Sequence, residues 1–277
     1  MAQLKGFPFV EKGHIDDLTI YQRSGKVIAR YRYNMPPRDY NPSENQKRQA
    51  TRLADIIRLW NSFPWDYRPY FQWRQGCASC YNTFVSYAMQ AHPIYLTRQM
   101  ASQGACVLTD VMVSQGTLTE IQVAHDGIAP VTDIRVGVMT LDDDTTVGQL
   151  SSAIVRNNFN YRQGDRLRYY LAEQRILFDD DTPMAHIDCH ELVLDPTDTM
   201  PLRQAIGHCP GFALRDGHLA AAFTVVGGMA WVHLRPNGTN MLASTQRMVC
   251  NNDSLMQQYG SEEAFAEASR SYRKIEK

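Results

Sequence analysis

Residues 230–249 read AWVHLRPNGTNMLASTQRMV, and the turn at their centre decides the class of fold. Asn237-Gly238 is typical of the tight turn that joins two antiparallel strands, because both positions tolerate a left-handed backbone. A second turn of this kind, Asp216-Gly217, stands upstream. Together the two turns predict an antiparallel meander with strands over residues 219–226, 230–235 and 241–249.

The region before residue 105 combines a hairpin with helices. Residues 17–33 alternate apolar and polar side chains around Ser24-Gly25, which predicts two paired strands. Ser43 and Gln46 have the spacing of a capping box, so we expect a helix that begins there and ends before Pro64. We expect a second helix over residues 77–91, with its apolar side chains on one face.

From about residue 105 strands predominate. Segments rich in Val, Ile and Thr predict strands over residues 105–113, 118–124, 131–141, 167–178 and 186–194. We expect a short helix over residues 147–157 and a closing helix from Ser261 to about Arg273. The predicted fold is therefore α+β: an N-terminal hairpin and two helices, then a mostly antiparallel, sandwich-like β body and a C-terminal helix.

The change from helical to strand-rich sequence near residue 105 also predicts the domains. A chain of 277 residues suits one or two domains. We place the boundary between residues 1–104, a hairpin with a helical element, and residues 105–277, a β-rich domain. A sub-boundary is expected near residues 196–210, where prolines interrupt the strands.

The composition is that of an ordinary globular protein. Apolar residues make up 44% of the chain, enough to form a core, and the net charge is −1. The molecule as a whole therefore has no field that would draw it to nucleic acid or to an anionic membrane. No apolar run is long enough for a membrane span, and the N-terminus lacks the apolar centre of a signal peptide. We expect reduced cysteines and a cytoplasmic location, with assembly into a particle or non-classical export left open.

Short segments spread over the chain carry a resemblance to a known family. They are Gly25-Lys26-Val27, Asn41-Pro42-Ser43-Glu44 with Gln46 and Arg48, Tyr87-Ala88-Met89, Val-Ser-x-Gly-x-Leu-Thr at 113–119, Gly-Asp-x-Leu at 164–167, Val232-His233-x-Arg235, and Ser-Thr-Gln-Arg at 244–247. In these positions the chain resembles an uncharacterised Bacteroidetes family of domains of unknown function. The resemblance implies a small N-terminal helical part followed by β-sandwich-like sheet, and it implies no activity.

Two cysteines have a spacing that carries chemistry in other proteins. Cys77 and Cys80 form a Cys-x-x-Cys pair, as in redox enzymes and zinc sites, but no second pair completes a four-cysteine zinc site. The same spacing places both thiols on the apolar stripe of the expected helix. Core packing is therefore the preferred interpretation, and the redox and metal interpretations stay open.

The histidines do not predict a metal site or a catalytic pair. His186, Asp188 and His190 would face one side of a strand, where each step of two residues advances about 6.8 Å, so the outer two cannot share one ion. His208-Cys209 are neighbours in sequence, whereas catalytic partners usually come from separate segments. An enzyme would require distant residues, such as His186, Cys189 and His208, to meet. We therefore assign no catalytic, cofactor-binding or metal-binding residue, and no cofactor.

Residues 23–58 are the one strongly charged region. They hold nine cationic and three acidic side chains, with tyrosines among the cations. Phosphate contact and base stacking need such a mixture, but so does a protein-docking surface, and an ordinary solvated surface is the third interpretation. The expected interaction surface consists of Arg23, Lys26, Arg30, Tyr31, Arg32, Tyr33, Arg48 and Arg52.

Three functions remain from the sequence. The preferred one is a non-catalytic structural or protein-interaction component of a larger assembly, phage-like or from another mobile element. Its partner would be another protein or a second copy, and no membrane or small-molecule partner is indicated. The alternatives are a nucleic-acid-binding protein that uses residues 23–58, and an enzyme whose site assembles from distant Cys and His residues.

Overall fold

The computed structural model describes residues 2–3, 13–15, 18–23, 26–31, 41–73, 79–125, 129–177, 181–206, 213–221 and 226–273. The chain divides into two compact units, Met1–Pro42 with Lys274–Lys277, and Ser43–Arg273. The second unit is called the body below. Each unit is described by itself.

The first unit contains a four-stranded antiparallel sheet with the order β1-β4-β3-β2. Its strands are β1 (Ala2–Gln3), β2 (Gly13–Ile15), β3 (Leu18–Arg23) and β4 (Lys26–Tyr31). Arg23 pairs with Lys26, so the predicted hairpin is confirmed in the residues described.

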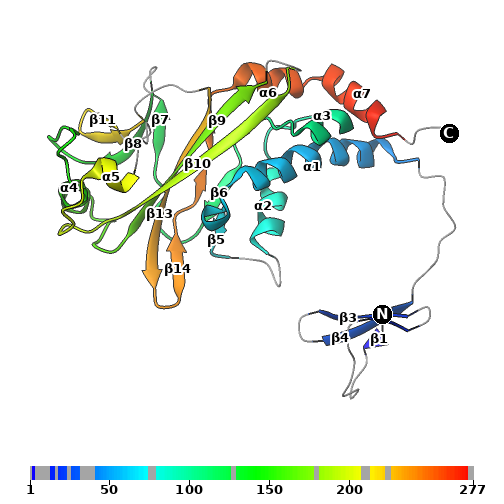
Figure 1. Cartoon of the computed structure of the whole chain (residues 1–277), viewed down its shortest axis with the longest axis horizontal. Helices are drawn as coiled ribbons and strands as arrows, with labels where there is room; N and C mark the ends of the chain where they lie inside the picture. The colour runs from blue at the N-terminus through cyan, green and yellow to red at the C-terminus, as the bar shows by residue number, and fades with distance from the viewer. Residues whose placement is uncertain are drawn as a thin grey trace. The chain divides into compact units, whose positions relative to one another are not determined.

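A five-stranded antiparallel sheet forms the centre of the body (Figure 1). Its main path is β10 (Pro183–Val193), β9 (Arg166–Ile176), β13 (Gly227–Asn237) and β14 (Asn240–Ala243), and β16 (Val249–Cys250) also pairs with β13. The predicted turn joins β13 to β14: Asn237 pairs with Asn240, and Gly238 has a φ of +61°. This left-handed conformation favours glycine, as the sequence pattern required.

Two smaller sheets complete the body. One is antiparallel and consists of β11 (Ala213–Arg215), β12 (His218–Ala220), β8 (Pro130–Arg135) and β7 (Val123–His125). The other has the order β15 (Gln246–Arg247), β6 (Met112–Gln115) and β5 (Tyr70–Phe71), in which β5 runs parallel to β6. The turn between β11 and β12 is Asp216-Gly217, with φ angles of +49° and +73°.

The first helix of the body begins where its cap predicts. Ser43 and Gln46 form both hydrogen bonds of the capping box of α1 (Glu44–Ser62). The other helices are α2 (Cys80–Ala88), α3 (Arg98–Gln103), α4 (Val147–Asn157), α5 (Leu202–Ile206), α6 (Asp253–Tyr259) and α7 (Glu262–Ser271), with a 3₁₀ turn at Trp65–Tyr67. The closing helix is thus preceded by a second short one. Within the part described, no helix is both long and apolar enough to cross a membrane.

The central sheet is covered on both faces. On β9, Tyr170 and Ala172 belong to a core shared with α1 and α2, whereas Tyr169 and Leu171 belong to a second core with α4 and β8. Strand β13 alternates in the same way, and its residues 227–234 are all buried. Successive side chains of a strand point to opposite faces, so one strand serves both cores.

The compact units of the structure do not coincide with the domain division expected from the sequence, which stays a prediction. We placed a boundary at residues 104/105, but the compact units divide after Pro42. The reason is that Ile56 and Leu59 of α1 and Phe84 of α2 share their core with β9 and β13. The helices therefore pack as part of the β-rich body.

Residues 105–109 are buried without belonging to a strand. Side chains replace the missing strand partner: Asp55 Oδ1 accepts from the Val107 amide (2.8 Å), and Gln174 Oε1 accepts from the Leu108 amide (2.9 Å). Asn252 Nδ2 donates to the Leu108 carbonyl (3.0 Å). The strand expected over residues 105–113 is therefore corrected, because only Met112–Gln115 forms one.

The first prediction concerns Asp55. Burial raises the pKa of Asp55 to about 7, although hydrogen bonds from Val107 and Cys106 oppose the shift. An unfolded aspartate ionises near pH 3.9, so this group lowers the stability of the wild type as the pH rises from about 4 to 7, by up to about 1.4 kcal/mol per pKa unit. Asp55→Asn keeps an acceptor for Val107 and does not titrate. Its stability relative to the wild type should therefore increase across this pH range and then level off.

Urea unfolding at several pH values measures this difference. Asp188→Asn is the control, because Asp188 is exposed on β10. A difference between Asp55→Asn and the wild type that stays constant from pH 4 to 8 would show that Asp55 ionises freely in the folded protein.

Candidate functional site

Asp165 is a buried carboxylate that holds several segments of the body together. It precedes β9 and accepts hydrogen bonds from His233 Nε2 (2.8 Å), from Arg235 Nε and Nη2 (both 2.7 Å), and from the Arg162 amide (2.9 Å). Its own backbone accepts from the Leu194 amide at the end of β10 (2.8 Å). One residue thus joins β9, β10 and β13. We call Asp165, His233 and Arg235 the Asp165 cluster.

The hydrogen bonds of this cluster keep Asp165 ionised and place a proton on His233 Nε2. Burial raises the pKa of Asp165, but the hydrogen bonds from Arg235, His233 and Arg162 outweigh it and hold the pKa well below its usual value. A carboxylate accepts hydrogen bonds and cannot donate them, so His233 must carry a proton on Nε2. In the neutral ring, Nδ1 then keeps its lone pair. The Tyr161 ring stacks on the imidazole, with the two centroids 4.4 Å apart.

A second set of contacts continues from His233 toward β6. The His233 amide donates to Ser244 Oγ (3.0 Å), and Ser114 Oγ donates to the Ser244 carbonyl (2.8 Å). Gly116 lies so close to β14 that an added Cβ would stand 2.1 Å from the Ala243 carbonyl oxygen. Any larger residue at Gly116 would therefore force the two segments apart.

Four segments that carry the family resemblance meet here. They are residues 113–119, 164–167, 232–235 and 244–247, which are far apart in the sequence. Sequence reasoning did not identify Asp165 or His233 as site residues, although both lie within these segments. The available signal was a histidine and an arginine two positions apart on one strand. This spacing places both side chains on the same face of the strand, where one carboxylate can bind them both.

The chemistry of the cluster is that of an anchor. Asp165 receives four hydrogen bonds, three at Oδ2 and one at Oδ1, and His233 and Arg235 both direct donors at it. A buried carboxylate with this many donors is stabilised in its ionised form. What remains open for a ligand is the other side of His233, which borders a cavity considered below.

The cysteines and histidines singled out in the sequence are dispersed. Cys80 is half-buried at the start of α2 and packs against the core shared with α1, while Cys77 lies outside the described residues. His186 and Asp188 form an exposed pair on β10, 3.3 Å apart. His208 and Cys209 also lie outside the described residues. Within the described ranges, no group of three His, Cys, Asp or Glu side chains has the geometry of a metal site.

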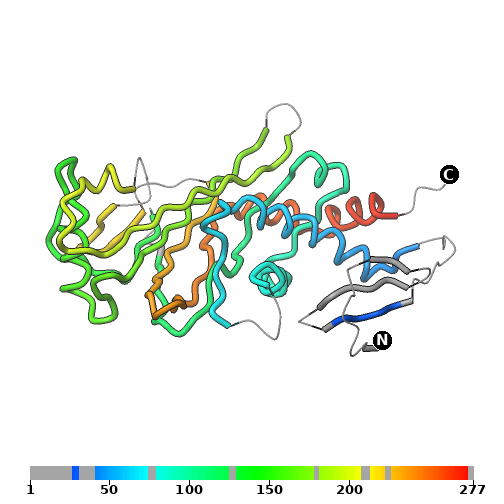
Figure 2. The backbone as a smooth tube through the Cα atoms, turned by 60° about the horizontal axis from the view of Figure 1, so that its bottom comes forward, coloured from blue at the N-terminus to red at the C-terminus, as the bar shows by residue number. Residues whose placement is uncertain are grey.

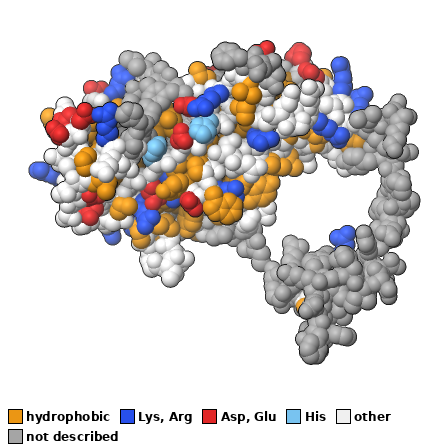
Figure 3. Space-filling view, viewed as in Figure 1, with side chains coloured by type: hydrophobic (Ala, Val, Ile, Leu, Met, Phe, Trp, Pro, Cys, Tyr) orange, Lys and Arg blue, Asp and Glu red, His pale blue; other side chains and the backbone are white. Residues whose placement is uncertain are grey.

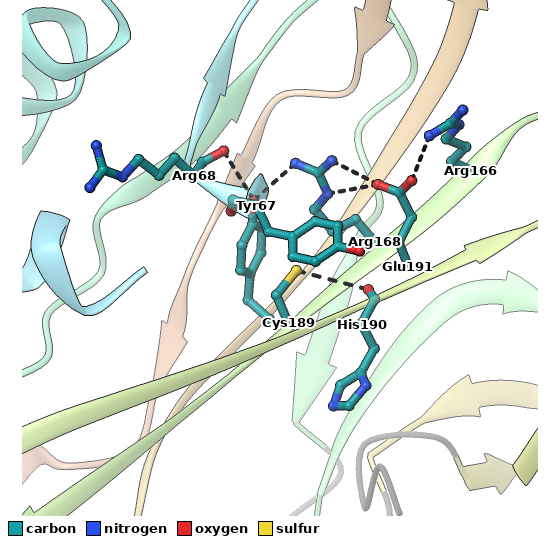
Figure 4. Close-up of polar contacts among 8 residues, drawn as sticks. Tyr67, Arg68, Arg166, Arg168, Cys189, His190 and Glu191 are labelled. Carbon is teal, nitrogen blue, oxygen red and sulfur yellow. Dashed lines mark hydrogen bonds and ion pairs between the residues drawn. The ribbon is translucent and has the colours of Figure 1, made fainter. Parts of the chain in front are cut away.

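Cys189 lies beside the half-buried ion pair of Arg168 and Glu191 (Figure 4). Its thiol is 4.0 Å from the His190 carbonyl oxygen, and Figure 4 shows the His190 ring turned away from it. Close by, Arg168 binds Glu191 through Nε and Nη2 (3.0 and 2.7 Å) and lies over the Tyr67 ring, 5.1 Å from its centroid. Arg168 therefore fastens the segment before β5 to the central sheet.

The expected interaction surface is divided between the two units. Arg23, Lys26, Arg30 and Tyr31 lie on β3 and β4 of the first unit, and Arg32 and Tyr33 lie outside the described residues. Arg48 and Arg52 lie on α1 of the body. Arg48 stands over the Phe265 ring of α7, which runs along α1 (Figure 2), and Arg52 donates to the carbonyls of Met89 and Ala91. These two cations thus serve contacts within the body.

Comparison with known proteins gives no relative: no family model, no curated protein and no solved structure matches the chain. The family resemblance therefore stays a prediction.

The second prediction concerns Asp165. Asp165→Asn removes the charge that His233 and Arg235 share, and breaking a buried ion pair in this way costs roughly 3–5 kcal/mol of stability. Because the pKa of Asp165 is lowered, its contribution is present above the unfolded value near 3.9 and is lost as the pH falls below it. The variant should therefore be less stable than the wild type at pH 7, with a gap that narrows in acid.

Urea unfolding followed by tryptophan fluorescence measures this gap. Asp143→Asn is the matched control, because Asp143 pairs with Arg203 on the surface, and such pairs contribute at most about 1 kcal/mol. Equal losses in the two variants at pH 7 would contradict the anchoring role of Asp165.

Proposed function

We propose that this protein is a non-catalytic component of a larger assembly, and that its first unit is the element that docks to a protein partner or to a second copy. The observation that carries the proposal is the small sheet formed by β1, β4, β3 and β2. It has few residues with which to build a core, and it lies in a unit distinct from the body.

The exposure of β4 supports this interpretation. Val27 and Ala29 share one face of the strand, and Ile28 shares the other with Arg30, because successive side chains alternate. Val27, Ile28 and Ala29 are all only half-buried. Both faces of the sheet thus keep partly exposed apolar side chains. A sheet this small is marginally stable alone, and an additional surface would bury them.

The body offers further surfaces for association. β10 ends the central sheet in the part described, and such an edge invites pairing with another chain. At its start, the Pro183 carbonyl already accepts from the Cys106 amide (2.7 Å). Trp65 and Trp73, 77% and 52% exposed, flank β5. In Figure 3 apolar side chains gather over this region of β5 and α2. Exposed apolar groups of this size are typical of interaction sites.

The other two functions receive less support. The nucleic-acid hypothesis needs free cations, but Arg48 and Arg52 bind groups of the body. The enzyme hypothesis needs His186 and Cys189 to meet other reactive groups, and His186 forms an exposed pair with Asp188 on β10. The cytoplasmic location stays a proposal, and it suits the thiols of Cys80, Cys106 and Cys250, which form no disulfide.

The third prediction tests docking through β4. Size-exclusion chromatography with light scattering on the full chain should give a mass of at least twice 31.6 kDa, or a complex with the product of a neighbouring gene. Val27→Asp with Ile28→Asp should abolish this association, because two charges cannot be buried in an apolar interface. All four tryptophans lie in the body, so their fluorescence shows whether the body of the variant is folded.

Arg30→Glu is the matched control on the same strand and should leave protein association intact. Loss of DNA or RNA binding in Arg30→Glu, with no effect of the double variant, would instead support the nucleic-acid hypothesis. A wild-type chain that stays monomeric at every concentration and forms no such complex would contradict the proposed function.

A further inference from the structure

A polar cavity of about 240 Å³ lies beside the Asp165 cluster. Its wall brings together separate parts of the body: the segment before β7, strand β8, the loop after α4, and β13. Its charged, aromatic and imidazole side chains are Glu120, Asp133, Arg135, Phe159, Tyr161 and His233. We call this space the His233 cavity.

Tyr161 and His233 are two largely buried polar side chains in the wall of the His233 cavity. Tyr161 is 8% exposed and His233 is 1% exposed. Among the residues described, nothing forms a hydrogen bond with Tyr161 Oη or with His233 Nδ1. Both side chains line the cavity, so its wall offers polar groups that a ligand can contact.

The charges of the wall indicate which kind of ligand. Glu120 and Asp133 are acidic, and Arg135 compensates only one of them, so the wall carries a net charge of about −1 at neutral pH. One oxygen of Asp133 accepts from the Gln122 amide (3.2 Å), which leaves the other for a ligand. The complementary ligand is therefore a cation rich in N–H donors.

The aromatic rings favour a guanidinium over other cationic ligands. Phe159, 94% exposed, and Tyr161 stand on the same wall. A guanidinium is planar, stacks on aromatic rings, and donates in a fork that matches carboxylates, whereas an ammonium is a point charge. The cavity is smaller than the 300–1,000 Å³ usual for drug-sized ligands, so it suits a group the size of one side chain.

We propose that the His233 cavity binds a guanidinium group, with Glu120 and Asp133 as its carboxylate partners and Phe159 as its stacking surface. The group comes either from a free small molecule or from an arginine of a docking chain. The second source rests on the proposed function, because β3 of a second copy contains Arg23. The first source does not depend on any assembly.

Titration calorimetry with four probes tests the proposal on the full chain. Agmatine and arginine carry a guanidinium, and citrulline is a neutral analogue of arginine. A peptide of residues 18–33 carries the arginines of β3 and β4. Agmatine and arginine should bind at least tenfold more tightly than citrulline. Competition of the peptide with agmatine would identify a docking chain as the source, and binding of agmatine without competition would identify a free molecule.

Substitutions in the cavity wall show whether agmatine binds in the His233 cavity. Glu120→Gln with Asp133→Asn should weaken agmatine binding at least tenfold, whereas Glu267→Gln, an exposed acid on α7, should leave it unchanged. Retained tryptophan fluorescence excludes unfolding as the cause. Equal binding of citrulline, equal binding by the double variant, or no binding of any guanidinium probe would overturn the proposal. Chain association measured by light scattering is independent of these titrations, so the two proposals can fail separately.

Discussion

A single buried charge, the carboxylate of Asp165, is the constraint on which this end of the body depends. A carboxylate removed from water is stable only where donors surround it. Here the donors come from β13, through His233 and Arg235, and from the Arg162 amide before β9. The strands must therefore be in register before the charge is compensated. The same requirement sets the tautomer of His233 and the position of the cavity beside it.

The rest of the body is organised by strands that are buried on both faces. β9 and β13 supply alternate side chains to two cores, one with α1 and α2 and one with α4 and β8. The middle of β9 and residues 227–234 of β13 are buried on both faces, so surfaces for binding lie at the periphery. The edge strand β10, the exposed tryptophans around β5 and the His233 cavity are the peripheral features of the body. The proposed function and the guanidinium site both follow from them.

Local rules predicted the elements that depend on local chemistry. Asn237-Gly238 and the Ser43–Gln46 box lie where the turn and the helix cap require them, because each depends on neighbouring residues alone. The strand expected over residues 105–113 was wrong over most of its length because Asp55, Gln174 and Asn252, remote in sequence, satisfy its backbone. Asp165 and His233 are 68 positions apart. No pattern of adjacent residues reveals such a pair, and sequence reasoning therefore searched for sites among the cysteines and the surface histidines.

The proton of His233 tests the central claim most directly. Long-range ¹H–¹⁵N NMR of the histidine side chains at pH 8 distinguishes a protonated ring nitrogen from one with a lone pair. The account predicts that His233 carries a proton on Nε2, bound to an ionised Asp165. A lone pair on Nε2, or rapid exchange between the two tautomers, would contradict it.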